Sequence, residues 1–494
     1  MKMSLKHRHN FESVAEQLKA GEKHYSQIKF AGKLSCAVIY PNLYSLGMSN
    51  LGFLTVHRLV GSMPGIGIER FFPALLPDSP LNPPFYSFET GRPLGDFNVL
   101  MFSFSFEGDF DKIPGIFAAL GMPVIASERS NRHPILIAGG AAVASNSAAL
   151  SLIFDIIVPG EAESTIVPII TTLNDKGFDK EAIAQIDNVW VPSLSKTYLP
   201  AKAYHDVNAS PAYSHIVSEK NAFGGAHIIE VMRGCPRVCS FCLARAIYSP
   251  PRAVSLQTIE QWLDAHADCT DLGLVAPSLF DHPEVEELFK MLTERNIRIR
   301  NSSVKWEKIT PTIIESLRKS NITGLTIAPE TGSERLRKEM RKPMDEGRFL
   351  NKINELFDNG FEHIKMYFVS CLPGETDSDT AATIDLIEKV LKIAPSYRSV
   401  SATFSVFVPK NHTEWSEQTA PEQYEIKKRT KYIKSMLQKL PGQFKANFES
   451  PNEALRQAYL SKVGPELADE YAREAKECRL NQLFSKNQFS ALEF

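Results

Sequence analysis

Apolar runs of strand length alternate with helix-patterned segments along most of the chain. The first half contains five such runs, and apolar positions at helical spacing follow most of them. The predicted strands cover 34–40, 66–72, 98–104, 135–138 and 154–158. Because strands that alternate with helices usually pair in parallel, the pattern predicts a doubly wound α/β sheet over 34–190. Such sheets bind ligands outside the carboxyl ends of their strands.

A second series of strands begins near residue 226. Short polar runs interrupted by prolines predict a linker over 191–225 between the two series. After the apolar run that begins this series, further predicted strands cover 272–276, 297–301, 324–328, 363–368 and 400–407. Residues 1–33 are typical of a polar helical lead-in. Residues 421–494 are charged and helix-patterned, and we interpret them as a helical cap over the substrate.

Composition narrows the class of protein. A length of 494 residues predicts two or three domains, and 43% hydrophobic with 23% charged residues is typical of a globular protein. The net charge of -2 gives no general attraction to nucleic acid or an anionic membrane. No apolar run is long enough to span a bilayer, and the polar start does not predict a secretory signal. Seven cysteines, an odd number that includes Cys478, predict a reducing, cytoplasmic compartment.

Three cysteines lie within eight residues: Cys235, Cys239 and Cys242. They follow an apolar run that predicts a buried strand, and the turn at 234–236 would aim all three thiolates at one point. Thiolates favour a soft metal, but a structural zinc site is normally closed by four ligands, and His227 lies back on the strand. An iron–sulfur cluster with one open position is therefore expected, with zinc or an accidental cysteine cluster as the alternatives.

The Cys-x3-Cys-x2-Cys spacing, with Phe241 directly before the third cysteine, resembles the motif of the radical S-adenosylmethionine (SAM) enzymes. The resemblance implies a four-iron, four-sulfur (4Fe-4S) cluster on the three cysteines, with SAM on the open iron and a 5′-deoxyadenosyl radical as the product of SAM cleavage. It further implies a partial (β/α)6 barrel of the TIM type over 226–420. An electron donor such as flavodoxin or ferredoxin would reduce the cluster.

Candidate SAM contacts lie at the ends of the predicted strands of the barrel. The segment 327–336 resembles the family's segment after the fourth strand, whose first glutamate, here Glu330, contacts SAM. The alternative is that Glu330 caps the next helix near the amides of Gly332 and Ser333. Ser302 and Ser303 end a predicted strand and would bond the ribose or carboxylate of SAM, although serine is also a common turn former.

Two further segments depart from the family pattern. Asp281 occupies the loop in which many relatives carry Gly-Gly-Glu-Pro for the SAM amino group, so Ser278 and backbone carbonyls are candidates for that contact. The segment 365–376 matches a family strand and loop, which makes Tyr367 and Cys371 candidates for catalysis. Cys371 stands where relatives usually have glycine. Such a thiol is more commonly a small packed residue than one that faces a radical site.

The order and spacing of the first module resemble the cobalamin-binding domain that precedes the cysteine motif in cobalamin-dependent radical SAM enzymes. A structural alternative is that the glycine pair at 139–140 only forms a tight turn between strand and helix. The Asp-x-His-x2-Gly pattern that supplies a histidine to cobalt is absent, so cobalamin would bind without a histidine below the cobalt. His57 is expected to be an ordinary packed or surface residue. The candidate cobalamin contacts are Tyr44, Ser45, Ser103, Gly139, Gly140, Gly160 and Glu161.

The resemblance implies a cobalamin-dependent radical SAM methyltransferase that methylates an unactivated carbon. The alternatives are a cobalamin-assisted cyclase or oxidase without net methylation, and a radical SAM enzyme whose first domain is empty. A metal-sensing binding protein is the alternative from outside the enzymes. The expected substrate is a small molecule, peptide or protein, and neither a membrane nor an extended nucleic acid is an expected partner.

Overall fold

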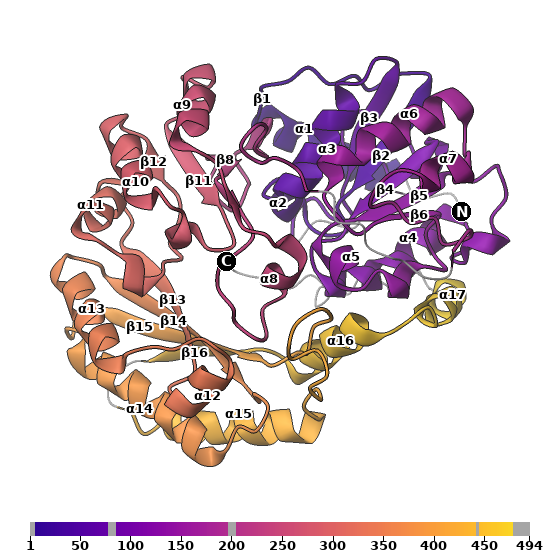
Figure 1. Ribbon diagram of the computed structural model, residues 1–494. Coiled ribbons are helices and arrows are strands. Elements are labelled where there is room, and N and C mark those ends of the chain that lie inside the picture. The colour runs from indigo at the N-terminus through magenta and orange to yellow at the C-terminus, as the bar shows by residue number, and fades with distance from the viewer. Residues whose placement is uncertain (1–4, 78–84, 196–203, 441–443, 478–494) are drawn as a thin grey trace. The chain divides into compact units, whose positions relative to one another are not determined.

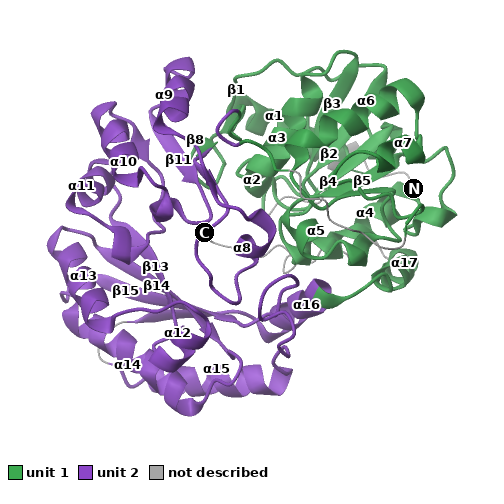
Figure 2. Ribbon diagram, viewed as in Figure 1, with its two compact units in different colours: residues 1–206, 210–229, 462–494 green, residues 207–209, 230–461 purple. Residues whose placement is uncertain are grey.

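The computed structural model describes residues 5–77, 85–195, 204–440 and 444–477 (Figure 1). The chain divides into two compact units, which Figure 2 colours separately. Unit 1 comprises residues 1–206, 210–229 and 462–494, and unit 2 comprises residues 207–209 and 230–461. Among the described residues, no helix combines the length and the apolar character that a membrane crossing needs. Cys478 lies outside the described residues.

Unit 1 is built on a five-stranded parallel sheet with the order β3-β2-β4-β5-β6. The five strands predicted over 34–190 are confirmed as β2 (Leu34–Ile39), β3 (Ile66–Phe71), β4 (Val99–Ser103), β5 (Ile135–Gly139) and β6 (Ile156–Val158). Nearly every residue of these strands is buried, as expected where helices cover both faces of a parallel sheet. The chain reverses its direction of travel across the sheet at β2, which creates a switch point beside the carboxyl ends of β2 and β4.

Helices connect and flank these strands in unit 1 (Figure 1). They are α1 (Leu5–Ala20), α2 (Tyr44–Gly47), α3 (Leu51–Gly61), α4 (Ile113–Leu120), α5 (Ala141–Ser145), α6 (Ile166–Lys176) and α7 (Lys180–Ala184). Asn50 starts α3 by accepting a hydrogen bond from the Phe53 amide. Aromatic rings fill the core between sheet and helices, with Phe104 edge-on to both Phe110 and Phe154.

The predicted lead-in and linker also pair with each other, which the sequence did not predict. The strand β1 (Glu22–His24) lies antiparallel to β7 (Ile216–Ser218). Beneath this pair, Arg70 is 1% exposed and donates to both carboxylate oxygens of Glu22 at 2.7 and 2.8 Å and to Glu89 at 2.5 Å. A buried guanidinium needs such partners, so the ion pairs fix β1 against the main sheet. The three-residue strands carry no periodic signal that could reveal them.

Unit 2 is a partial barrel whose strands follow chain order. One sheet runs β8 (His227–Glu230), β11 (Asp271–Val275) and β12 (Arg298–Ile299). The other runs β13 (Gly324–Glu330), β14 (His363–Ser370), β15 (Ser399–Val406) and β16 (Lys445–Phe448), all parallel. An isolated bridge between Ser303 and Thr326 joins the two sheets. The strands predicted for the second half are therefore confirmed, and β16 is additional.

The helices of unit 2 lie mainly on the outside of this curved sheet (Figure 1). They are α8 (Leu243–Tyr248), α9 (Leu256–Ala265), α10 (Val285–Glu294), α11 (Pro311–Lys319), α12 (Glu334–Glu339), α13 (Glu346–Asp358), α14 (Asp377–Ile393), α15 (Gln423–Leu437) and α16 (Pro451–Lys462). Side-chain caps start many of them, including a capping box in which Thr376 and Asp379 bond each other's backbone at the start of α14.

The prediction of a purely helical C-terminal region over 421–494 is wrong. β16 adds a strand to the barrel sheet, where Phe448 stacks on Phe404 with ring centroids 5.1 Å apart. After α16 the chain enters unit 1, where α17 (Leu467–Glu477) packs and Tyr471 donates to Asp111 at 2.8 Å. The four-residue strand lacks β-branched residues, so its sequence resembles a loop and only its pairing with β15 defines it.

Gly140 is required by the backbone of unit 1. Its φ is 110°, and an added Cβ would lie 2.3 Å from the carbonyl oxygen of Phe104. Gly177, the C-cap of α6, has a similar glycine-only backbone with φ 71° and ψ -153°, but an added Cβ would meet nothing within 4 Å. The tight-turn interpretation therefore accounts for Gly140.

We expect Gly177→Ala to destabilise the protein by about 1–3 kcal/mol through backbone strain. Gly140→Ala should cost about 1 kcal/mol or more in addition to that strain. The two variants share the strain and differ in the clash with Phe104. Urea unfolding of both variants and the wild type measures the difference. Equal losses would show that the clash relaxes without cost.

Candidate functional site

The cysteine loop of unit 2 follows two short strands. After β8, the strand β9 (Met232–Arg233) pairs antiparallel with β10 (Arg252–Ala253). Arg233 donates to both carboxylate oxygens of Glu230 at 2.8 and 2.7 Å, which fixes the chain just before the loop. Gly234 then turns with φ 82°, and an added Cβ would lie 2.4 Å from the Tyr248 carbonyl oxygen. Only glycine fits this turn, so the loop leaves β9 in a fixed direction.

The far side of the loop is held by backbone hydrogen bonds and by an aromatic anchor. The Ser240 amide donates to the Met340 carbonyl, and the Trp415 amide donates to the Ser240 carbonyl, both at 3.1 Å. Phe241 packs against an apolar cluster that includes Leu336 and Met340. The aromatic residue before the third cysteine therefore anchors the loop to α12 by burying its ring.

The three cysteines are partly buried free thiols, and Cys242 is the N-cap residue of α8. Burial raises the pKa of Cys239, Lys342 opposes that rise, and the charges of Cys235 and Cys242 reinforce it. Within the described part of the chain, no three histidine, cysteine or carboxylate side chains converge as a metal site. The prediction that the turn aims all three thiolates at one point stays a prediction, because thiols gain nothing by converging until a metal bonds them.

The donor set nevertheless fits an iron–sulfur cluster. Cys235, Cys239 and Cys242 share one eight-residue loop and lie close enough for each charge to affect Cys239. Three soft thiolates with no fourth protein ligand match a cluster that leaves one iron open. These three residues would hold the cluster.

Glu330 lies beside the cysteine loop. It is the last residue of β13, with φ 66° and a side chain 13% exposed. Lys342 donates to its Oε1 at 2.6 Å and to the Ala328 carbonyl oxygen at 2.8 Å. Both Glu330 and Lys342 act electrostatically on Cys239. The predicted position of Glu330 at a strand end is confirmed, and its contact with SAM stays a prediction.

The helix-capping alternative for Glu330 is wrong. The amide of Gly332 donates to Thr383 at 2.9 Å, and the amide of Ser333 donates to Thr331 at 3.1 Å. The N-cap of α12 is Ser333, whose hydroxyl accepts from the Leu336 amide. Because other groups already satisfy this helix end, the carboxylate of Glu330 is available for another role.

Asp281 is engaged by cations. It accepts from Arg237 Nε at 2.9 Å and Nη2 at 2.6 Å, from Ser278 at 2.7 Å, and from Lys305. Burial would raise the pKa of Asp281, but the hydrogen bonds from Arg237, Lys305 and Ser278 hold it well below its usual range. Since Arg237 belongs to the cysteine loop, Asp281 and Ser278 position that loop. The predicted contacts of Asp281 and Ser278 with the SAM amino group gain no support, because the Asp281 carboxylate already accepts hydrogen bonds from three residues.

Ser302 and Ser303 are exposed and lie between β12 and β13. The Ser302 carbonyl accepts from the Thr326 amide at 2.8 Å, so the backbone continues the strand pairing through them. Among the described contacts, neither hydroxyl has a hydrogen-bond partner in the protein. Both hydroxyls are therefore free to bond a ligand, and their predicted role stays a prediction.

Tyr367 and Cys371 lie on β14 and just after it. Tyr367 is partly buried, and the Lys365 ammonium lies 5.0 Å from its ring centroid. Cys371 has φ 58°, which explains why glycine suits this position. It packs against a cluster containing Val406 and Ile426, and burial raises its pKa to about 12. The packing favours the space-filling interpretation of Cys371, and a catalytic role for either residue stays a prediction.

The predicted cobalamin contacts gather at the carboxyl edge of the unit 1 sheet, with one exception. Tyr44 is 0% exposed, and its hydroxyl donates to Glu22 at 2.6 Å and Ser218 at 2.9 Å. Its side chain belongs to the core, so the predicted cobalamin contact of this side chain is wrong. Ser45 and Ser103 are partly exposed, and an added Cβ at Gly139 would make only ordinary contacts at 3.6 Å or more. These three positions fit a ligand at this edge.

The other positions at this edge have structural roles. Besides Gly140, Gly160 packs closely against Asn188, and Glu161 accepts from the His205 amide at 2.7 Å. His57 is 1% exposed and lies 3.0 Å, Nδ1 to Nε2, from His215, which confirms that it is an ordinary packed histidine.

Sequence reasoning missed four functional candidates. In unit 2 these are Arg237, which belongs to the cysteine loop, and Lys305 and Lys342, which interact with Asp281 and Glu330. In unit 1, Asp109 follows β4 and accepts from Asn42 at 2.8 Å, and burial raises its pKa to about 7. Single charged residues in loops carry no spacing signal, so only their partners reveal them.

Comparisons with known proteins agree with this site. Residues 52–192 match the model for the N-terminal part of radical SAM proteins, and residues 229–387 match the model for the radical SAM superfamily. An uncharacterized protein of Methanocaldococcus jannaschii is 29% identical over 445 residues, which cover 89% of this chain and 91% of that protein.

A solved structure has a similar fold. It is the cobalamin-dependent S-adenosylmethionine radical enzyme OxsB with aqua-cobalamin and S-adenosylmethionine bound, at a TM-score of 0.51 and 12% identity. The match covers 82% of this chain, which spans 56% of the length of OxsB. The cysteine loop, the barrel and the two matching models lead to one conclusion. The chain carries a radical SAM domain over residues 229–387, preceded by a segment that matches the N-terminal part of radical SAM proteins.

Proposed function

We propose that this protein is a cobalamin-dependent radical SAM methyltransferase that methylates an unactivated carbon. The observation that carries the proposal is the position of Cys239 beside the Glu330–Lys342 pair, at the carboxyl end of β13. The fold similarity to OxsB and the open carboxyl edge of the unit 1 sheet support the cobalamin part. When bound, the cluster would supply the electron that cleaves SAM, and cobalamin would supply the methyl group.

The residues of unit 2 would bind and orient SAM. The Glu330 carboxylate would accept hydrogen bonds from the amino or ribose groups of SAM and balance the sulfonium charge. Lys342 holds that carboxylate at the strand end and keeps a positive charge beside Cys239, which favours its thiolate. The free hydroxyls of Ser302 and Ser303 would add hydrogen bonds to the ribose or carboxylate.

The cysteine loop must also stay in place when it receives its cluster. Arg237 is held to Asp281, and Asp281 is held in turn by Lys305 and Ser278. This network fixes the loop from one side, while Phe241 fixes it from the other. Such positioning matters because radical chemistry depends on the distance between the reacting atoms.

An electron donor such as flavodoxin or ferredoxin would serve the cluster, and the free cysteines suit a reducing, cytoplasmic setting. The substrate would be a small molecule, a peptide or a protein. A radical SAM enzyme without cobalamin is the second candidate. The structural roles of Tyr44, Gly140 and Gly160 favour that candidate, because they explain these residues without a cofactor.

Anaerobic reconstitution with iron, sulfide, cobalamin, reductant and SAM tests the proposed function. We expect both S-adenosylhomocysteine and 5′-deoxyadenosine by mass spectrometry, with the homocysteine product dependent on cobalamin. Formation of 5′-deoxyadenosine alone, at the same rate with and without cobalamin, would contradict the methyltransferase and support the second candidate.

Replacement of Cys235, Cys239 and Cys242 by alanine is expected to remove bound iron, from roughly four atoms per chain to nearly none. The matched control is Cys269→Ala, which changes a buried cysteine outside the loop. Iron analysis and visible absorbance give the result. Iron retained by the triple variant at the level of the control would contradict the cluster assignment.

Asp281→Asn is expected to leave the cations Arg237 and Lys305 without their shared counter-charge. We predict a loss of about 1–3 kcal/mol in stability and faster loss of the reconstituted cluster. Asp264→Asn, at a 67% exposed carboxylate paired with Arg295, is the control and should change stability by less than about 0.5 kcal/mol. Urea unfolding and the time course of iron release measure both effects. An unchanged rate of iron release in Asp281→Asn would show that this network does not position the loop.

A further inference from the structure

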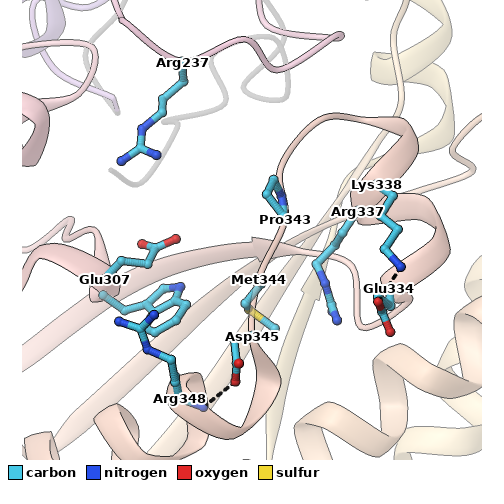
Figure 3. A pocket seen from close by; sticks show the side chains of 10 residues that line it. Arg237, Glu307, Glu334, Arg337, Lys338, Pro343, Met344, Asp345 and Arg348 are labelled. Carbon is cyan, nitrogen blue, oxygen red and sulfur yellow. Dashed lines mark hydrogen bonds and ion pairs between the residues drawn. The ribbon is translucent and has the colours of Figure 1, made fainter.

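A cavity of about 400 Å³ lies in unit 2 beside the cysteine loop. Its walls come from α12, the segment 343–345, the first turn of α13, the short helix η7 (Trp306–Lys308) and Arg237. Figure 3 shows charged side chains from these elements around one space. Four cationic and three acidic side chains line it, so the pairing among them decides what the cavity can bind.

Arg337 is a buried cation without an acidic partner. It is 2% exposed, and its Nη1 donates to the Thr331 carbonyl oxygen at 2.9 Å. Its Nε is buried and has no hydrogen-bond partner. Among the described residues, no carboxylate lies within ion-pair distance of Arg337. Burial lowers its pKa, and the more distant carboxylates of Glu346 and Glu334 oppose that shift. Buried guanidinium groups are normally paired, so this one calls for an anion.

Arg348 is a second guanidinium at the same cavity. It lies in the first turn of α13, and within the described chain its side chain forms no ion pair. Figure 3 shows its side chain among the residues that line the cavity. Two arginines on different elements, neither held by a carboxylate, therefore line one space.

The other charges at the cavity, with the exception of Glu307, are already engaged. Lys338 pairs with Glu334 at 2.6 Å, and Arg237 is held by Asp281. Asp345 caps α13 by accepting from the Arg348 amide at 2.8 Å. Glu307 is the remaining acid, and it acts electrostatically on Arg237. An incoming anion would therefore meet Arg337 and Arg348 as its available cations.

We propose that this cavity binds a phosphate monoester, with Arg337 and Arg348 holding the phosphate group. A phosphate dianion matches two guanidinium charges, and the planar forks of arginine fit its oxygens. The cavity has the volume of a small-molecule site and exceeds what inorganic phosphate needs. Trp306 and Met344 offer apolar surface to the organic part of the ligand. SAM carries no phosphate, so this ligand is distinct from SAM.

Phenyl phosphate is the probe that tests the proposal, in calorimetric titrations of the full-length protein at low salt. We expect Arg337→Leu and Arg348→Ala each to weaken binding at least tenfold. Arg335→Leu is the matched control, because Arg335 lies on the same helix but is exposed and paired with Glu339 and Asp379. The control should bind within twofold of the wild type.

A thermal measurement separates lost binding from lost folding. Leucine in place of Arg337 removes a buried, unpaired charge together with its hydrogen bond to the Thr331 carbonyl oxygen; these two effects oppose each other, so the melting temperature without ligand should change little. Phenyl phosphate should raise the melting temperature of the wild type and of Arg335→Leu, but not that of Arg337→Leu.

Three results would overturn the inference: unchanged affinity in both arginine variants, equally tight binding of benzoate, or displacement of phenyl phosphate by SAM. None of these experiments needs the cluster or cobalamin, so their outcome is independent of the proposed methyl transfer.

Discussion

The ammonium group of Lys342 is the contact on which the site of unit 2 depends. It bonds the Ala328 carbonyl oxygen and the Glu330 carboxylate at the end of β13, and its charge acts on Cys239. The same ammonium opposes the rise that burial causes in the pKa of Cys239. One lysine serves both groups, and it thereby links the strand that would orient SAM to the loop that would hold the cluster.

Backbone strain is concentrated at the same end of the barrel. Gly234, Glu330 and Cys371 all have positive φ, and two of the three are not glycine. A side chain in the left-handed region costs on the order of 1 kcal/mol, so it persists only where the surroundings fix it. At Glu330 that strain places a carboxylate beside the cysteine loop. At Cys371 the same positive φ places the side chain against apolar residues.

The charged residues of unit 1 are arranged differently from those at the strand end of unit 2. Arg70, Glu22 and Glu89 form a buried ion network next to Tyr44. The carboxyl edge is left with small side chains and backbone, at Ser45, Ser103 and Gly139. Such an edge suits a large ligand that is recognised through shape and backbone contacts. The two units therefore offer different surroundings to a ligand. Unit 1 has an edge with small side chains, and unit 2 has a strand end with charged side chains.

The sequence determined the features that depend on neighbouring residues. Apolar runs located the strands of both units, the cysteine spacing located the loop, and the strand-end position of Glu330 followed from the residues around it. These features are local, since the period of a strand and the spacing of a motif are written in consecutive residues. Tertiary structure alone decided which distant groups meet. It paired Arg237 with Asp281 and Lys342 with Glu330, buried Tyr44 against Glu22, joined β1 to β7, and made a strand of 445–448. Charges and short edge strands acquire partners only when the chain folds, so no local pattern contains them.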